Sequence, residues 1–116
     1  MTFLAPEAAP SHDAVIALQG TTLLEFGTGW CGHCQAARPL IDAALADAPP
    51  GLRHIQVEDG KGRPLGRSFG VKLWPTLVVL QDGTEVARAV RPQSAQVVRD
   101  ALGAGAGTAG RSGPQR

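Results

Sequence analysis

The sequence predicts one α/β domain, in which a mixed sheet of four or five strands lies between two layers of helices. Three observations lead to this fold class. Short apolar runs alternate with segments of helical periodicity, a helical segment joins the first two strands as in a parallel βαβ unit, and a turn dipeptide near the end predicts an antiparallel hairpin. A chain of 116 residues with 43% apolar residues is long enough for one such domain.

The first half of the chain supplies the βαβ unit. A short helix is expected over residues 12–18, and the apolar run 22–26 fits a buried strand. Apolar residues recur at three- and four-residue spacing over 31–48, which predicts an amphipathic helix with Pro39 inside it. Residues 52–57 form the next strand, parallel to the first through a right-handed crossover.

The second half supplies the hairpin and the last helix. Pro64 is suited to begin a short helix over residues 64–69, and residues 76–80 and 85–90 form two strands around an Asp-Gly turn. Ser94 can cap the last helix, whose apolar residues are expected to face the sheet: Val97, Val98, Ala101 and Leu102.

The composition divides the chain into three parts. Residues 1–10 form an N-terminal segment, with at most a vestigial edge strand around residues 2–4. Residues 11–102 form the domain. Residues 103–116 are rich in glycine and alanine, and we expect them to be a disordered tail.

The charge balance and the first residues bear on partners and compartment. A formal net charge of +1 gives no reason to expect nucleic acid or an anionic membrane as a partner. Residues 1–10 contain neither the basic nor the apolar region of a signal peptide, and no run of about 18 apolar residues could cross a membrane. We expect a cytoplasmic monomer.

Both cysteines, Cys31 and Cys34, stand in one Cys-x-x-Cys motif where the long helix begins. The start of a helix has unpaired N–H groups and the positive end of the helix dipole, which lower the pKa of a thiol there. We therefore expect Cys31 to be the attacking thiolate and Cys34 the resolving thiol. Gly32 and His33 lie between them and are expected to tune the thiol pKa, since a protonated His33 would favour the thiolate.

Two other functions of the cysteine pair have less support from the sequence. A metal half-site would need two histidines from among His12, His33 and His54, but the chain has no second Cys-x-x-Cys and His33 lies between the thiols. A structural disulfide would close a very short loop and would constrain the unfolded chain little. We expect neither a metal nor another cofactor.

The motif and its surroundings resemble the thioredoxin superfamily over roughly residues 11–102. The resemblance rests on Glu25-Phe26, Trp30-Cys31-Gly32-His33-Cys34, Pro39 and Trp74-Pro75-Thr76. The Cys-Gly-His-Cys version is similar to the catalytic domains of protein disulfide isomerase, because thioredoxin itself usually has proline where this motif has histidine.

The resemblance implies roles that the residues alone would not suggest. Glu25 would be a buried base that takes the proton from the resolving cysteine, with a pKa raised by burial, although alone it reads as a strand-end residue in contact with water. Trp30 would border and shield the thiols. Pro75 would follow a cis peptide bond, and the backbone of Trp74 would pair with an extended substrate segment.

Two residues depart from the family pattern. Trp74 is bulkier than the usual aliphatic residue, although disulfide isomerases also have an aromatic residue there. Arg91 stands where thioredoxins have a glycine near the site. We favour the interpretation that Arg91 is a solvated surface charge. If it turned toward the site, its charge would favour one thiolate and leave less room for large partners.

Together these features predict a protein dithiol-disulfide oxidoreductase. It would reduce or exchange disulfides in protein substrates and be restored by a recycling reductase or oxidant. The missing signal peptide favours a reductase, whereas His33 and Trp74 favour a disulfide-isomerase-like oxidant. The remaining alternative is a redox-sensing or non-catalytic interaction domain of the same fold.

Overall fold

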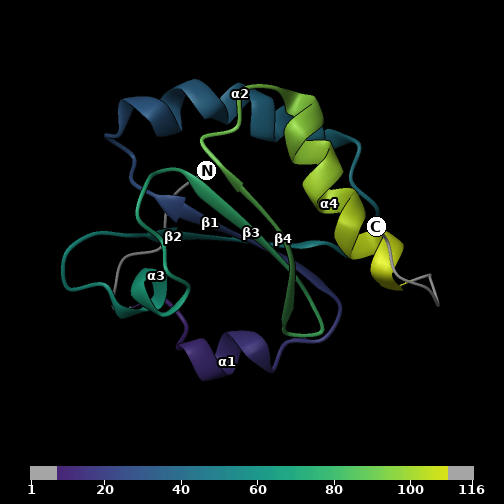
Figure 1. Cartoon of the computed structure of the whole chain (residues 1–116), viewed down its shortest axis with the longest axis horizontal. Helices are drawn as coiled ribbons and strands as arrows, with labels where there is room; N and C mark the ends of the chain where they lie inside the picture. The colour runs from purple at the N-terminus through teal and green to yellow at the C-terminus, as the bar shows by residue number, and fades with distance from the viewer. Residues whose placement is uncertain (1–7, 110–116) are drawn as a thin grey trace.

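The computed structural model describes residues 8–109 and shows a central sheet with helices on both faces (Figure 1). The elements follow in the order α1 (His12–Ile16), β1 (Thr21–Gly27), α2 (Gly32–Ala46), β2 (Arg53–Glu58), α3 (Pro64–Ser68), β3 (Thr76–Gln81), β4 (Thr84–Val90) and α4 (Ala95–Ala109). Helices α2 and α4 cover one face of the sheet, and α1 and α3 lie on the other. The three-layer prediction is therefore confirmed.

The sheet has the strand order β2-β1-β3-β4 within the described residues. β1 and β2 are parallel, as the βαβ prediction required, and Phe26 lies beside Val57. β3 runs antiparallel to both β1 and β4, with Thr76 beside Phe26 on one side and Val90 on the other. The vestigial strand expected around residues 2–4 lies outside the described residues.

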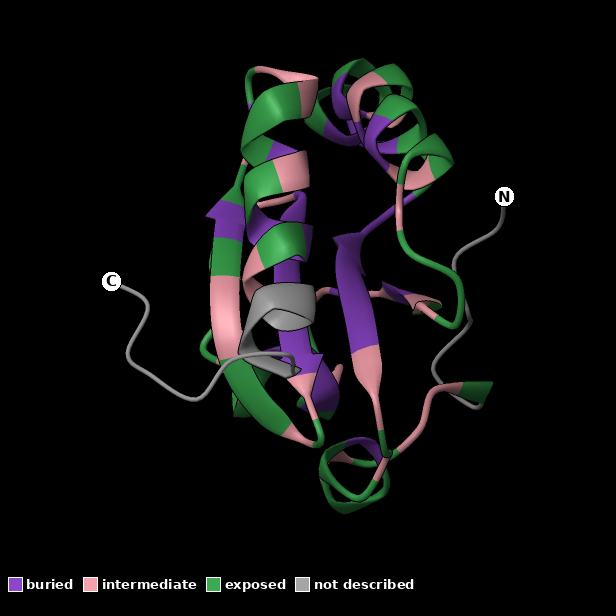
Figure 2. Ribbon diagram, turned by 90° about the vertical axis from the view of Figure 1, so that its right-hand side faces the viewer, coloured by how far each residue is buried: buried purple, intermediate pink, exposed green. Residues whose placement is uncertain are grey.

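Alternation along the strands divides the apolar side chains between two cores. One core lies under α2 and α4 and contains these buried residues: Leu23, Ala37, Ile41, Ala44, Leu77, Val79, Ala89, Val98, Ala101 and Leu102. The other lies against α1 and α3: Val15, Leu24, Phe26, Val57, Leu65, Val78 and Leu80. Neighbours in sequence thus point to opposite faces, as side chains in strands must. Figure 2 shows the resulting buried central strands and the exposed outer surfaces of the helices.

The hairpin between β3 and β4 depends on two residues with positive φ. Asp82 has φ 53° and Gly83 has φ 85°, which is the backbone of a tight turn that matches the twist of the strands. The Asp82 side chain accepts a hydrogen bond of 2.7 Å from the backbone of Gly20. A Cβ atom added to Gly83 would collide with the backbone of Ile16, so the turn packs directly on the end of α1.

The C-terminal region differs from the prediction in the length of the last helix and in the position of Val97. Helix α4 continues to Ala109, past the domain end expected at residue 102, and the disordered tail expected over 103–116 stays a prediction. Glycine disfavours a helix, but the alanines between the glycines favour it, and a helix that is already nucleated gains one hydrogen bond for each residue it adds. Val97 does not face the sheet, because 44% of it is exposed, whereas Val98 is fully buried. Residues 110–116 lie outside the described part.

Candidate redox site

Four segments that are distant in sequence meet where β1 ends. β1 leads through a short loop to the cysteines at the start of α2. Because β3 is antiparallel to β1, Thr76 lies beside Phe26 and Pro75 reaches the same edge. Arg91 follows β4 there, and its N–H donates a 2.9 Å hydrogen bond to the Pro75 carbonyl. The loop after β2 begins at this edge too, which is where α/β sheets bind ligands.

Cys31 is the N-cap of α2, and its sulfur accepts a hydrogen bond of 3.4 Å from the N–H of Cys34. It is a free thiol with 9% of its surface exposed. Burial by itself raises the pKa of the Cys31 thiol. Other effects outweigh burial and lower that pKa: hydrogen bonds from the thiol and the N–H of Cys34, a hydrogen bond from the N–H of His33, and the positive charge of Arg91. Cys31 therefore ionises more readily than an ordinary cysteine.

Cys34 lies one turn further along the helix, and its environment acts in the opposite direction. Burial, the hydrogen bond with Cys31 and the negative charges of Cys31 and Glu25 raise the pKa of the Cys34 thiol to about 12, against a backbone hydrogen bond with Thr28 that lowers it. The two thiols thus differ in the sense expected for an attacking thiolate and a resolving thiol.

Of the two residues between the cysteines, His33 acts on Cys31 through its backbone. His33 has an exposed side chain, and its backbone N–H is what helps to lower the pKa of Cys31. The positive charge that helps to lower the pKa of Cys31 is that of Arg91. A Cβ atom added to Gly32 would meet nothing within 4 Å, so glycine leaves open space beside the thiols. The effect expected from the His33 side chain stays a prediction.

Glu25 is fully buried, and both of its carboxylate oxygens have a partner. Oε2 accepts a 2.8 Å hydrogen bond from the guanidinium of Arg38 in α2, and Oε1 lies 2.8 Å from Nε2 of His54 in β2. A carboxylate can remain charged inside a protein when such partners compensate it. The resemblance implied that Glu25 is buried, but neither of its partners was predicted from the sequence.

The sequence does contain a signal that could have identified these partners. Glu25 shares the α2 side of the sheet with Leu23, and His54 is on that side too because it alternates with Ile55. A buried acid on that side needs a cationic neighbour, and Arg38 is the cation that α2 provides near it.

Two tryptophans lie beside the thiols. Trp30 is 72% exposed, and its ring makes a T-shaped contact with that of Trp74 at a centroid distance of 5.8 Å. Trp74 donates a 2.8 Å hydrogen bond from Nε1 to the Asp59 carboxylate. The Trp74–Pro75 peptide bond is cis. Asp59 is a further residue that the sequence analysis missed, and it fixes the orientation of the Trp74 ring.

Arg91 is not the solvated surface charge that we favoured from the sequence. It has φ 49°, and its Nε donates a 2.8 Å hydrogen bond to the carbonyl of Trp74. Its side chain therefore lies across the backbone that the resemblance assigns to substrate pairing. The guanidinium also lies close enough to Cys31 to lower the pKa of that thiol.

The histidines considered for a metal site have other partners. His54 bonds Glu25, and Nδ1 of His12 lies 2.8 Å from the hydroxyl of Ser68. Within residues 8–109, no group of three histidine, cysteine, aspartate or glutamate side chains could hold a metal ion. In the same part of the chain, no helix is both long and apolar enough to span a membrane.

A sequence model described as thioredoxin matches residues 4–103. The thioredoxin of Chlamydia muridarum is 36% identical over 72 residues, which are 61% of this chain and 69% of that protein. Protein disulfide isomerase-like 5-3 of Oryza sativa subsp. japonica is 33% identical over 77 residues, which are 64% of this chain but 18% of that protein.

Solved structures agree with the sequence comparisons. Thioredoxin 2 from Pseudomonas aeruginosa PAO1 in its reduced form superposes with a TM-score of 0.81 and 54% identity, covering 93% of this chain and 97% of that one. A mutant thioredoxin from Halobacterium salinarum NRC-1 has a TM-score of 0.66 and 26% identity, covering 87% of this chain and 88% of that one. The chain thus spans most of these thioredoxins and a small part of the disulfide isomerase.

Proposed function

Because this chain belongs to the thioredoxin family, whose members are protein disulfide oxidoreductases, we propose that its thiol pair reduces disulfides in protein substrates. The observation that carries the proposal is the asymmetry of the thiols. The pKa of Cys31 is lowered, whereas that of Cys34 is raised to about 12. One cysteine is thus suited to attack a disulfide, and the other keeps its proton until the second step.

The reaction proceeds in two exchanges. The Cys31 thiolate attacks one sulfur of the substrate disulfide, forms a mixed disulfide and releases the other sulfur as a thiolate. Cys34 then loses its proton and attacks the Cys31 sulfur, which releases the second substrate thiolate and leaves a Cys31–Cys34 disulfide. Two electrons pass to the substrate, and a recycling reductase supplies two others that reduce the Cys31–Cys34 disulfide again.

Glu25 is proposed as the base for the second step. Its carboxylate is fully buried, and its charge helps to raise the pKa of Cys34. A neighbouring base is what a thiol of such high pKa needs, because at neutral pH it ionises too rarely to attack. Replacing Glu25 with alanine should slow release of the substrate from the mixed disulfide and leave the first attack nearly unchanged. An unchanged release rate would remove Glu25 from this role.

Reduction is proposed as the main direction, in a monomer that works in the cytoplasm. The support is that the identity is higher with the thioredoxins of Pseudomonas aeruginosa (54%) and Chlamydia muridarum (36%) than with the rice disulfide isomerase-like protein (33%). A second candidate is a disulfide-isomerase-like oxidant. The charge of Arg91 supports it, because stabilising the Cys31 thiolate stabilises the reduced form.

Two measurements test these proposals. Insulin reduction should be rapid with the native chain and absent with Cys31→Ser, and equal rates would refute the proposed activity. Equilibration against glutathione, with the thiols counted by alkylation, gives the reduction potential of the couple. A value near about −270 mV indicates a reductant, whereas one near about −180 mV indicates the oxidant.

A further inference from the structure

The lysines and arginines of the described residues fall into two groups. Five of the nine use their side chains to bond carboxylates, carbonyls or a hydroxyl: Arg38, Arg53, Arg88, Arg91 and Arg99. For the other four, no side-chain hydrogen bond or ion pair occurs within residues 8–109: Lys61, Arg63, Arg67 and Lys72. All four line one pocket of about 390 Å³, which we call the basic pocket.

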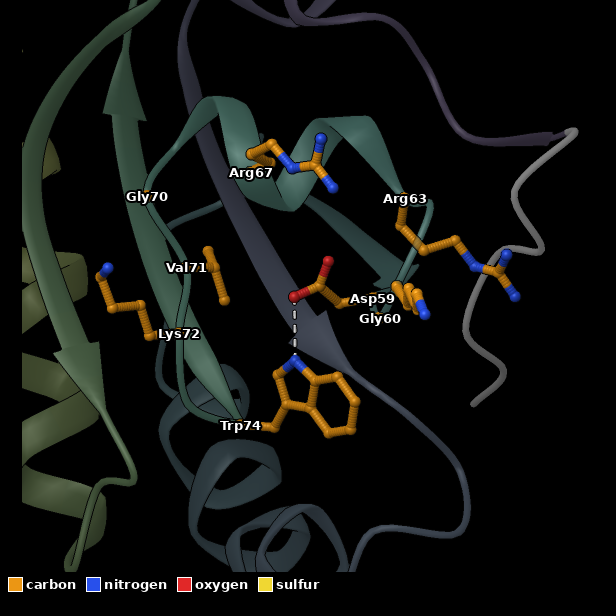
Figure 3. Close-up of a pocket in the computed structure, with 9 residues that line it drawn as sticks. Asp59, Gly60, Arg63, Arg67, Gly70, Val71, Lys72 and Trp74 are labelled. Carbon is orange, nitrogen blue, oxygen red and sulfur yellow. Dashed lines mark hydrogen bonds between the residues drawn. The ribbon is translucent and has the colours of Figure 1, made fainter.

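The basic pocket lies between the loop after β2, helix α3 and the segment before Trp74 (Figure 3). Three of its four cations have exposed side chains, and the half-buried Arg63 has a buried Nε without a hydrogen-bond partner. The one acid in its lining is Asp59, which is 9% exposed and already accepts a hydrogen bond from Trp74. The pocket therefore has an uncompensated positive charge in a chain whose formal net charge is only +1.

Trp74 joins the basic pocket to the redox site. One side of its indole is hydrogen-bonded to Asp59 inside the pocket, and its ring meets Trp30 beside Cys31. A polypeptide whose disulfide reaches Cys31 and whose backbone passes Trp74 would therefore continue directly onto the basic pocket. Complementary charge on that part of a substrate would strengthen its docking, so that this substrate is preferred over others.

We infer that the basic pocket binds acidic residues adjacent to the disulfide of a protein substrate, so that this chain prefers disulfides in acidic surroundings. The inference rests on the proposed function, since it assigns the pocket to the substrate of that reaction. A polypeptide suits the arrangement better than a small anion because the cations are spread over three segments around an open pocket beside the redox site. Several carboxylates along one chain can reach them together.

The test compares three disulfide-linked peptides that differ only in the residues beside one cysteine, which are three glutamates, three glutamines or three lysines. Each peptide is made with these residues on either side of the cysteine. Reduction by the full chain is measured as kcat/KM at 50 mM and 500 mM NaCl. The expected result is a rate about fivefold higher for the glutamate than for the glutamine peptide at low salt, and a smaller ratio at high salt.

Matched variants locate the effect. Lys61→Gln/Arg67→Gln removes two exposed charges from the basic pocket and should bring the glutamate-to-glutamine ratio close to one. Arg53→Gln/Arg99→Gln removes the same charge from residues that do not line the pocket and should keep the ratio. Unfolding curves of both variants show that each is folded.

The outcomes separate the inference from the proposed function. If no peptide is reduced, the proposed function fails. If all three peptides are reduced at equal rates, the function stands and the inference is refuted. A glutamate preference that persists in the pocket variant also refutes it, because recognition then lies elsewhere. Loss of that preference on adding a short DNA oligonucleotide at the protein's concentration would make nucleic acid the better occupant and overturn the assignment to a peptide.

Discussion

The ion pair between Arg38 and Glu25 gives the sharpest test of how the site is held together. Replacing Arg38 with methionine keeps most of the side-chain volume but removes the guanidinium 2.8 Å from Oε2 of the buried carboxylate. Glu25 would then be left with His54 as its remaining partner. We expect the reduced protein to lose stability, because a buried charge without compensation is costly.

The magnitude follows from the exposure of the two partners. Breaking a fully buried pair by removing one partner costs about 3–5 kcal/mol. The Arg38 side chain is 27% exposed, whereas that of Glu25 is fully buried, so water can replace part of the lost interaction. We therefore expect a loss of about 2 kcal/mol in the free energy of unfolding, or about 8 °C in Tm. Urea unfolding of the reduced protein, followed by circular dichroism, measures the loss.

Arg38 also bonds Asp42, which provides the matched control. Asp42 is 52% exposed and lies one turn along the helix from Arg38, so Asp42→Ala should cost only about 0.3 kcal/mol. The double variant Glu25→Leu/Arg38→Met removes both charges of the pair and should recover most of the stability lost in Arg38→Met. The reasoning is refuted if Arg38→Met costs no more than Asp42→Ala, or if the double variant is less stable than Arg38→Met.

Three further predictions concern the thiol, the hairpin and the tryptophan beside the site. Removing the positive charge in Arg91→Ala should raise the pKa of Cys31. Alkylation of Cys31 by iodoacetamide should then slow about twofold at pH 6.5, while the rate at high pH is unaffected. Equal rates of the variant and the native chain at pH 6.5 would contradict this. Gly83→Ala should lower the free energy of unfolding in urea by about 3 kcal/mol, because φ is 85° and the new Cβ would collide with the α1 backbone. A loss below about 1 kcal/mol would mean that the turn does not pack tightly on α1. Trp74→Phe leaves the Asp59 carboxylate without its indole donor and should cost about 1–2 kcal/mol, which Trp74→Phe/Asp59→Leu should largely restore; no recovery in the double variant would count against the bond.

The parts of this structure that could be predicted are those encoded by neighbouring residues. The period of apolar residues predicted β1, α2 and β2, and the Asp-Gly dipeptide predicted the hairpin, because strand alternation, helix periodicity and turn chemistry act over a few residues. The position of Cys31 at the start of α2 also followed from local pattern, and with it the difference between the thiols.

The missed parts depend on contacts between distant segments. Arg91 reads as a surface charge until the sheet register brings it next to Pro75, where its side chain reaches the carbonyl of Trp74. The partners of Glu25 come from α2 and β2, and their choice depends on how that helix lies on the sheet. The basic pocket is likewise visible only after every other described cation has been given its partner.

The pairing of Trp30 with Trp74 has a consequence for how this protein can be observed. They are the two tryptophans of the chain, which has no tyrosine, and both lie at the redox site. Fluorescence excited at the indole band therefore comes entirely from the place where the chemistry occurs. Oxidation of the thiols or docking of a substrate can be followed without a label. A change in emission during unfolding reports the loss of structure at this edge of the sheet.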